Sequence, residues 1–165
     1  MIVEVHDLGK RYGQLDAVQG LEFGISEGSA FALVGPNGAG KTTTIKVLLN
    51  LLTPSQGNVD ILGVDSRSLS PREFADIGYV SENQVLPGRL TVDAYLAYLR
   101  PFYRRWDTSL EMSLRDDMQL PATRRIGDLS HGMRIKMALV CALSYRPRLL
   151  ILDEPFAGLD ALVRD

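Results

Sequence analysis

Hydrophobic and polar positions follow a period of two near the N-terminus. Apolar residues alternate, or nearly so, over residues 2–5 and 21–25, which predicts antiparallel strands. Tyr12-Gly13 and Glu27-Gly28 provide turn signals between and after these two stretches. The chain is therefore expected to begin with a β-rich part.

Mostly apolar segments predict further strands. Three of them are short and cover residues 30–34, 59–62 and 77–80. A fourth, residues 149–152, is apolar at every position, as expected for a parallel strand buried on both faces.

A helical period appears after residue 44 and again between residues 90 and 143. The first helix should end before Pro54, and Ser70-Pro71 should open a short one. Thr91 can cap a helix that Pro101 kinks or ends. Two more amphipathic stretches lie at residues 110–118 and 135–143, and the last three helices are expected to form a small subdomain.

Composition fits one globular domain of 165 residues, with 45% hydrophobic and 23% charged residues. The longest apolar run, residues 137–143, is much shorter than the roughly 18 residues of a membrane span, and we expect no signal peptide. The single cysteine, Cys141, excludes an internal disulfide and is expected in the core. A formal charge of −2 gives no reason to expect a nucleic-acid partner.

A glycine-rich loop stands between an expected strand and an expected helix. Its glycines allow positive φ and close approach of backbone N–H groups to phosphate oxygens. The helix that follows directs its own N–H groups and dipole at the same anion. Lys41 would add a charge on the β and γ phosphates, and the Thr42 hydroxyl suits Mg²⁺. The residues of the predicted nucleotide site here are Gly35, Pro36, Asn37, Gly38, Ala39, Gly40, Lys41, Thr42 and Thr43.

Two adjacent acids, Asp153 and Glu154, follow the apolar run at residues 149–152. Acids that leave a buried strand are costly unless a cation or donor meets them. We interpret Asp153 as a ligand of Mg²⁺ and Glu154 as the general base for an attacking water. A solvated strand end is the structural alternative.

These pieces, in this order, resemble the ATP-binding subunit of ABC transporters. Gly35 to Thr42 matches the family's Walker A motif, and residues 149–154 match Walker B with its catalytic glutamate. Residues 156–160 look like the D-loop, with Asp160 as its acid. Tyr12 lies where the family stacks an aromatic ring on adenine, although an exposed turn tyrosine is a competing interpretation.

The family's signature, Leu-Ser-Gly-Gly-Gln, has a partial match at residues 129–133. The leucine, the serine and the second glycine are retained as Leu129, Ser130 and Gly132. The residues implied to bind the nucleotide of a second subunit are Ser130, His131, Gly132 and Met133. His131 and Met133 replace a glycine and a glutamine of the family pattern.

Two more departures from the family pattern concern the metal and the end of the sheet. Where the family has a glutamine that touches Mg²⁺ and water, this sequence has Glu82, with Gln84 two residues later; a carboxylate can still ligate the metal. The family also has a later strand that ends in a histidine, and neither His6 nor His131 can be that residue. The resemblance thus implies a domain shortened after the D-loop, whose sheet lacks an interior strand. The chain would then be a fragment, or the two strand edges beside the gap would close on each other, or another chain would fill the gap.

The resemblance implies an α/β fold of the P-loop NTPase class, with a parallel sheet flanked by helices, an N-terminal antiparallel part and a helical subdomain. Residues 1–88 and 146–165 would form the core, and residues 89–145 the helical subdomain. The implied activity is ATP hydrolysis with Mg²⁺, catalysed by Lys41, Glu82 and Glu154, with Thr42, Asp153 and Glu82 at the metal.

The implied partners are a transmembrane permease and a second ATP-binding subunit, which would hold the chain at the cytoplasmic face of a membrane. Two alternatives stay open. One is a non-hydrolysing nucleotide-binding or dimerising fragment, and the other is an ABC ATPase that acts without a permease.

Overall fold

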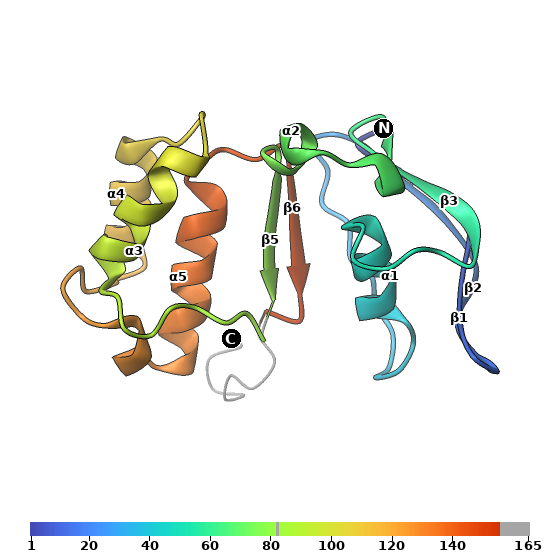
Figure 1. The fold of residues 1–165 in the computed structure, drawn as a ribbon, viewed down its shortest axis with the longest axis horizontal. Helices are drawn as coiled ribbons and strands as arrows, with labels where there is room; N and C mark the ends of the chain where they lie inside the picture. Colours follow the sequence, from blue (N-terminus) through green and yellow to red (C-terminus); the bar gives the residue numbers. More distant parts are fainter. Residues whose placement is uncertain (82, 156–165) are drawn as a thin grey trace. The chain divides into compact units, whose positions relative to one another are not determined.

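The computed structural model describes residues 1–81 and 83–155. They divide into two compact units, Met1–Phe74 and a second that begins at Ala75. Figure 1 shows an antiparallel sheet with a helix in the first unit, and a parallel sheet with helices in the second. The expected α/β class is confirmed, because both kinds of sheet are present with helices.

The sheet of the first unit has the order β2-β1-β3-β4, and all its pairs are antiparallel. Its strands are β1 (Val3–Tyr12), β2 (Leu15–Ile25), β3 (Gln56–Ile61) and β4 (Val64–Asp65). The turn predicted at Tyr12-Gly13 joins β1 to β2, where Tyr12 pairs with Leu15. The two strands extend further than their apolar alternation predicted, because polar pairs such as Arg11 and Asp16 continue the ladder.

Helix α1 (Lys41–Leu48) follows the glycine loop, as predicted, and ends before Pro54. It buries Ile45, Val47 and Leu48, which share the first unit with the buried strand residues of β1 and β3. The 3₁₀ turn η1 (Ser66–Ser68) and the short helix α2 (Pro71–Phe74) close the unit. The predicted opening of α2 at Ser70 is confirmed, since the Arg72 amide donates to Ser70 Oγ at 3.2 Å.

The strand predicted at residues 30–34 is wrong. These residues have no strand assignment, and Phe31 and Val34 are 49% and 89% exposed. A strand is defined by ladder hydrogen bonds to a neighbour, and no described strand pairs with this segment. Phe31 instead stacks on Phe23 of β2, with ring centroids 4.8 Å apart.

The second unit contains β5 (Ile77–Ser81) and β6 (Leu149–Asp153), two strands that their apolar segments predicted, and the structure pairs them as a parallel sheet. Helix α5 (His131–Leu143) packs on it through Ala138 and Ala142, which cluster with Val80. The expected burial of β6 on both faces is wrong, because Leu152 is 39% exposed. Within the described residues β5 is the only strand that pairs with β6, so part of β6 is left exposed.

The described part of the second unit has four further helical segments: α3 (Val92–Leu99), η2 (Arg100–Phe102), α4 (Thr108–Asp117) and η3 (Ile126–Asp128). The predicted cap is confirmed, since Thr91 Oγ1 accepts from the Ala94 amide at 3.2 Å. The helices enclose a core that includes Leu96, Met137 and, as predicted, Cys141. No helix in the described part of the chain is both long and apolar enough to cross a bilayer. The predicted division at residues 88–89 and 145–146 stays a prediction.

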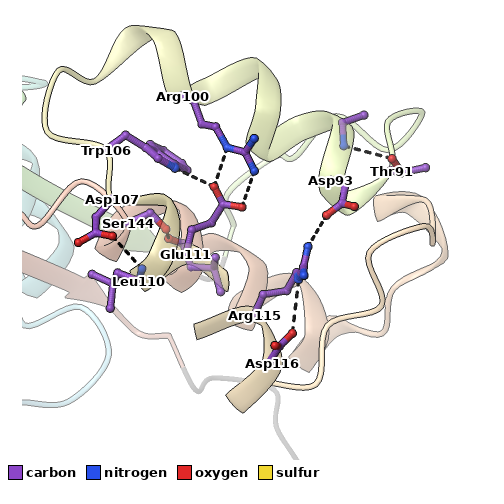
Figure 2. Close-up of polar contacts among 12 residues, drawn as sticks. Thr91, Asp93, Arg100, Trp106, Asp107, Leu110, Glu111, Arg115, Asp116 and Ser144 are labelled. Atoms are coloured by element: carbon purple, nitrogen blue, oxygen red, sulfur yellow. Dashed lines mark hydrogen bonds and ion pairs between the residues drawn. The ribbon is translucent and has the colours of Figure 1, made fainter. Parts of the chain in front are cut away.

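Figure 2 shows a buried carboxylate, Glu111, that ties η2 to α4. Arg100 donates to both of its oxygens at 2.8 Å, and Trp106 Nε1 donates at 2.7 Å. Burial alone would raise the pKa of Glu111, but the bonds from Arg100 and Trp106 outweigh it and hold that pKa below its ordinary value. The carboxylate is therefore charged at neutral pH and organises this part of the helical layer.

Candidate functional site

The glycine loop makes a tight turn into α1. Ala39 N donates to Pro36 O at 3.1 Å, and Gly38 and Gly40 both have φ of +84°, which a side chain would strain. Gly40 is the N-cap of α1 and has no side chain with which to cap it. The first amides of a helix lack intrahelical acceptors, so the loop presents N–H donors and the positive end of the helix dipole.

Lys41, the first residue of α1, carries the positive charge of this loop. Its ammonium donates to Gly35 O at 2.9 Å and to Pro36 O at 3.1 Å. The side chain thus folds back across the loop, and its charge stands among the backbone groups that were predicted to bind phosphate. An anion in the loop would meet this charge as well as the amides.

A hollow of about 480 Å³ opens beside the loop within the first unit. Gly38, Ala39, Lys41 and Thr44 form one side of it. The other side comes from the chain around Leu33 and from β2, and the lining residues there are Asp16, Ala17, Val18, Gln19, Leu21, Leu33 and Val34. This volume lies in the range of pockets that hold small organic ligands.

The β2 side of this hollow was missed by the sequence reasoning. Asp16, Val18 and Gln19 stand at no spacing that marks a binding motif. They line the hollow because β2 runs past the start of α1, and Gly40 is packed directly against Ala17 and Val18. Only this packing identifies them.

Tyr12 lies at the hairpin between β1 and β2 and is 45% exposed. It is not among the described residues that line the hollow beside the loop. Lys10 Nζ lies 5.2 Å from the centroid of its ring, as in a cation–π contact. Adenine stacking on Tyr12 stays a prediction.

The two described candidates for the metal, Thr42 and Asp153, belong to different units. Hydroxyl and carboxylate oxygens are suitable ligands for Mg²⁺, which commonly takes one or two protein ligands together with phosphates and water. Within residues 1–81 and 83–155, no group of three His, Cys, Asp or Glu side chains could hold a metal. Each of these oxygens by itself suits Mg²⁺, and a metal site that joins Thr42 to Asp153 stays a prediction.

The two acids at the end of β6 differ in their surroundings. Asp153 ends the strand and is 8% exposed, whereas Glu154 is exposed and has φ of +50°, unusual for a residue with a side chain. Glu154 thus follows the strand in a strained backbone conformation of the kind that clusters at functional sites.

The parallel register of β5 and β6 places Ser81 beside Asp153. Ser81, the last residue of β5, therefore lies beside the predicted Walker B acid. Glu82 lies outside the described residues, as does Asp160 of the predicted D-loop. Gln84, the other candidate after β5, lines a small cleft with His131 and Arg134 of α5.

The predicted signature residues form the start of α5. Ser130 is its N-cap, and Ser130 Oγ accepts from the Met133 amide at 3.2 Å. His131 and Gly132 are in the first turn, where backbone amides face the end of the helix. The sequence expectation placed this helix near residue 135, and the structure extends it back to the motif.

Comparison with known proteins gives a consistent result. A family described as "ABC transporter" matches residues 18–157. The probable multidrug ABC transporter ATP-binding protein YbhF of Escherichia coli (strain K12) is 33% identical over 99% of this chain. The Nod factor export ATP-binding protein I of Rhizobium meliloti (strain 1021) is 36% identical over 98% of it.

A solved structure of an ATP-binding subunit of an ABC transporter superimposes with a TM-score of 0.86 at 31% identity, over 99% of this chain and 70% of that one. The chain spans 29% of the length of YbhF and 50% of that of the Nod factor protein. The family match covers most of the chain, including the glycine loop, the signature region, Asp153 and Glu154. The chain therefore belongs to the ABC transporter family, in the part of that family named for ATP binding.

Proposed function

We propose that this chain binds ATP with Mg²⁺ and hydrolyses it to drive a partner membrane permease. The single observation that carries the proposal is the glycine loop with Lys41 folded across it, beside a hollow of about 480 Å³. Such a loop at a helix N-terminus combines amide donors, a helix dipole and a cation around one anion.

In the proposed site, the loop residues Gly35 to Thr43 hold the triphosphate. Lys41 stabilises the charge that develops on the β and γ phosphates during transfer. Thr42, Asp153 and Glu82 would hold Mg²⁺, which neutralises phosphate charge when bound. Glu154 accepts the proton of the attacking water, a role that its exposed position after β6 supports.

The proposed assembly pairs two such subunits around the nucleotides. Each site would receive Ser130, His131, Gly132 and Met133 from the second subunit. The N-terminal end of α5 supports this, since it presents amides and a positive dipole end to an anion. Asp160 of the D-loop would take part at the same junction.

The relatives support a transport role. YbhF is named a probable multidrug transporter component and the Rhizobium protein an export component, and each is an ATP-binding protein by name. We therefore propose that a permease holds the chain at the cytoplasmic face of a membrane. The relatives differ in what their names say they export or import, so the transported substrate is left unassigned.

Isothermal titration calorimetry with MgATP tests the nucleotide site. Lys41→Ala should weaken binding by about tenfold or more, because it removes a charge-assisted contact to phosphate. Lys46→Ala is the matched control, since Lys46 is exposed in the last turn of the same helix and should bind as the parent does. Equal affinity of the parent and Lys41→Ala would refute the phosphate-binding loop.

A further inference from the structure

Asp16 of β2 stands where two hollows of the first unit meet. One is the hollow of about 480 Å³ beside the glycine loop, and the other, of about 670 Å³, lies along β1 and β2. Asp16, Val18 and Gln19 line both. A ligand that enters the glycine loop and extends along β2 would pass this carboxylate.

The Asp16 side chain is held in place by its neighbours. Arg11 donates to both carboxylate oxygens, one of these bonds measuring 3.0 Å, and Gln19 Nε2 donates at 2.9 Å. The hydrogen bonds from Arg11 are the main reason that the pKa of Asp16 lies below its ordinary value. The group is therefore a charged carboxylate that can only accept hydrogen bonds.

The carboxylate keeps room for a further donor. A carboxylate has about four lone-pair sites, and Arg11 and Gln19 occupy three of them. The Asp16 side chain is 26% exposed, so a ligand in the hollow can reach it. A phosphate would be repelled there, whereas a hydroxyl or amino group would be bound.

The order of groups in a nucleotide indicates whether a sugar hydroxyl or a base amino group would lie nearest to Asp16. The phosphates would lie at Lys41 and the start of α1, and Gly40 is packed on Ala17 and Val18, next to Asp16 in the chain. The sugar is bonded directly to the α phosphate, so it is the first part of the ligand beyond the loop. An acidic side chain is a suitable partner for ribose hydroxyls, as it is in dinucleotide-binding folds.

We propose that Asp16 accepts a hydrogen bond from the ribose 2′-hydroxyl of the bound nucleotide, with Arg11 as its positioning residue. This inference rests on the proposed function, because it assigns the sugar end of the same site. It makes Asp16 a specificity residue for ribonucleotides, on a strand outside the motifs that carry the family resemblance.

The test compares affinities of the full chain for ATP, 2′-deoxyATP, ITP and inorganic tripolyphosphate by calorimetry. The parent should bind ATP about five- to tenfold more tightly than 2′-deoxyATP, as expected for loss of one hydrogen bond to a charged group. In Asp16→Ala this ratio should fall to about one. Tripolyphosphate binding should be retained, which shows that the loop is folded.

Two further variants sharpen the test. Asp7→Asn changes an acid that lines only the larger hollow, so it should keep the parent ratio of ATP to 2′-deoxyATP affinity. Arg11→Gln should lower that ratio in part, because the carboxylate stays but loses its orientation.

An unchanged ratio in Asp16→Ala would overturn the inference. A second result would also overturn it: Asp16→Ala could keep the ratio of ATP to 2′-deoxyATP affinity but lose a preference for ATP over ITP. Because ITP lacks the amino group of the base, that result would assign Asp16 to the base. A parent chain that binds neither ATP nor tripolyphosphate would overturn the proposed function itself, together with this inference. Retained tripolyphosphate binding separates the first two results from the third.

Discussion

Gly40 lies against Ala17 so closely that a Cβ on residue 40 would come within 2.4 Å of the Ala17 carbonyl oxygen. The same residue has φ of +84°. Two independent constraints therefore require glycine at the start of α1, one from the backbone conformation and one from the neighbouring strand. This contact fixes the glycine loop to β2 and so shapes the hollow between them.

Gly40→Ala should lower the free energy of unfolding by about 3 kcal/mol, from left-handed backbone strain and overpacking together. Gly38→Ala is the matched control, since Gly38 has the same φ but a Cβ added there would meet nothing within 4 Å. It should cost about 1 kcal/mol. Urea denaturation measures both values, and equal costs would show that the contact with Ala17 does not constrain the loop.

Ser130→Ala should lower the free energy of unfolding by about 1 kcal/mol, because Ser130 caps α5. Thr91→Ala, which removes the cap of α3, should cost a similar amount and serves as the control. Ser130→Asp retains a cap and should restore stability. If the hydroxyl also meets a nucleotide on a second subunit, ATP-dependent dimerisation followed by light scattering should be lost in both Ser130 variants and kept in Thr91→Ala.

The contribution of the Arg100–Glu111 ion pair (Figure 2) to the free energy of unfolding should depend on pH. The pKa of Glu111 is lower in the folded chain than its ordinary 4.5, so its contribution is present above about pH 4.5 and is lost as pH falls through the folded pKa. Glu111→Gln should therefore reduce the stability difference between pH 7 and acidic pH, measured by thermal denaturation.

Arg100→Met should be more destabilising than Glu111→Gln. Glu111 is fully buried, whereas the Arg100 side chain is 39% exposed and can be solvated without its partner. Loss of Arg100 leaves a buried charge, with an expected cost of about 3 kcal/mol at pH 7. This cost should shrink at low pH as Glu111 takes up a proton; the opposite order of the two variants would contradict this account.

Glu154→Gln should reduce ATP turnover of the chain about 100-fold or more, because it removes the proposed proton acceptor. The dissociation constant for ATP should stay within about twofold of the parent value, since glutamine keeps the shape of the side chain. Glu22→Gln, on β2 and exposed, is a control of the same chemical change. Phosphate release measures turnover, and a fully active Glu154→Gln would exclude this residue as the base.

Local sequence signals predicted local structure well. The positive-φ glycines of the loop, the caps at Ser70 and Thr91, and the strands β5 and β6 were each predictable, because each depends on residue types within a few positions or on one apolar segment.

Features that depend on distant neighbours were not predictable. Residues 30–34 are as apolar as β5, yet they are no strand, because pairing depends on what lies alongside. Nothing in the sequence distinguishes Asp16 from the other acidic residues, and only the position of β2 beside the glycine loop places it at the hollow. The buried position of Glu111 likewise depends on η2 and Trp106, which supply its donors.

The surroundings of Cys141 have a practical consequence for such experiments. It is the chain's one cysteine, it is buried, and burial raises the pKa of its thiol to about 12. Thiolate is the reactive form, so maleimide reagents at neutral pH should leave this position unlabelled in the folded state. A cysteine introduced at an exposed site could then carry a fluorophore or spin label in the otherwise unmodified sequence, and distances between labelled subunits could be followed directly during nucleotide binding.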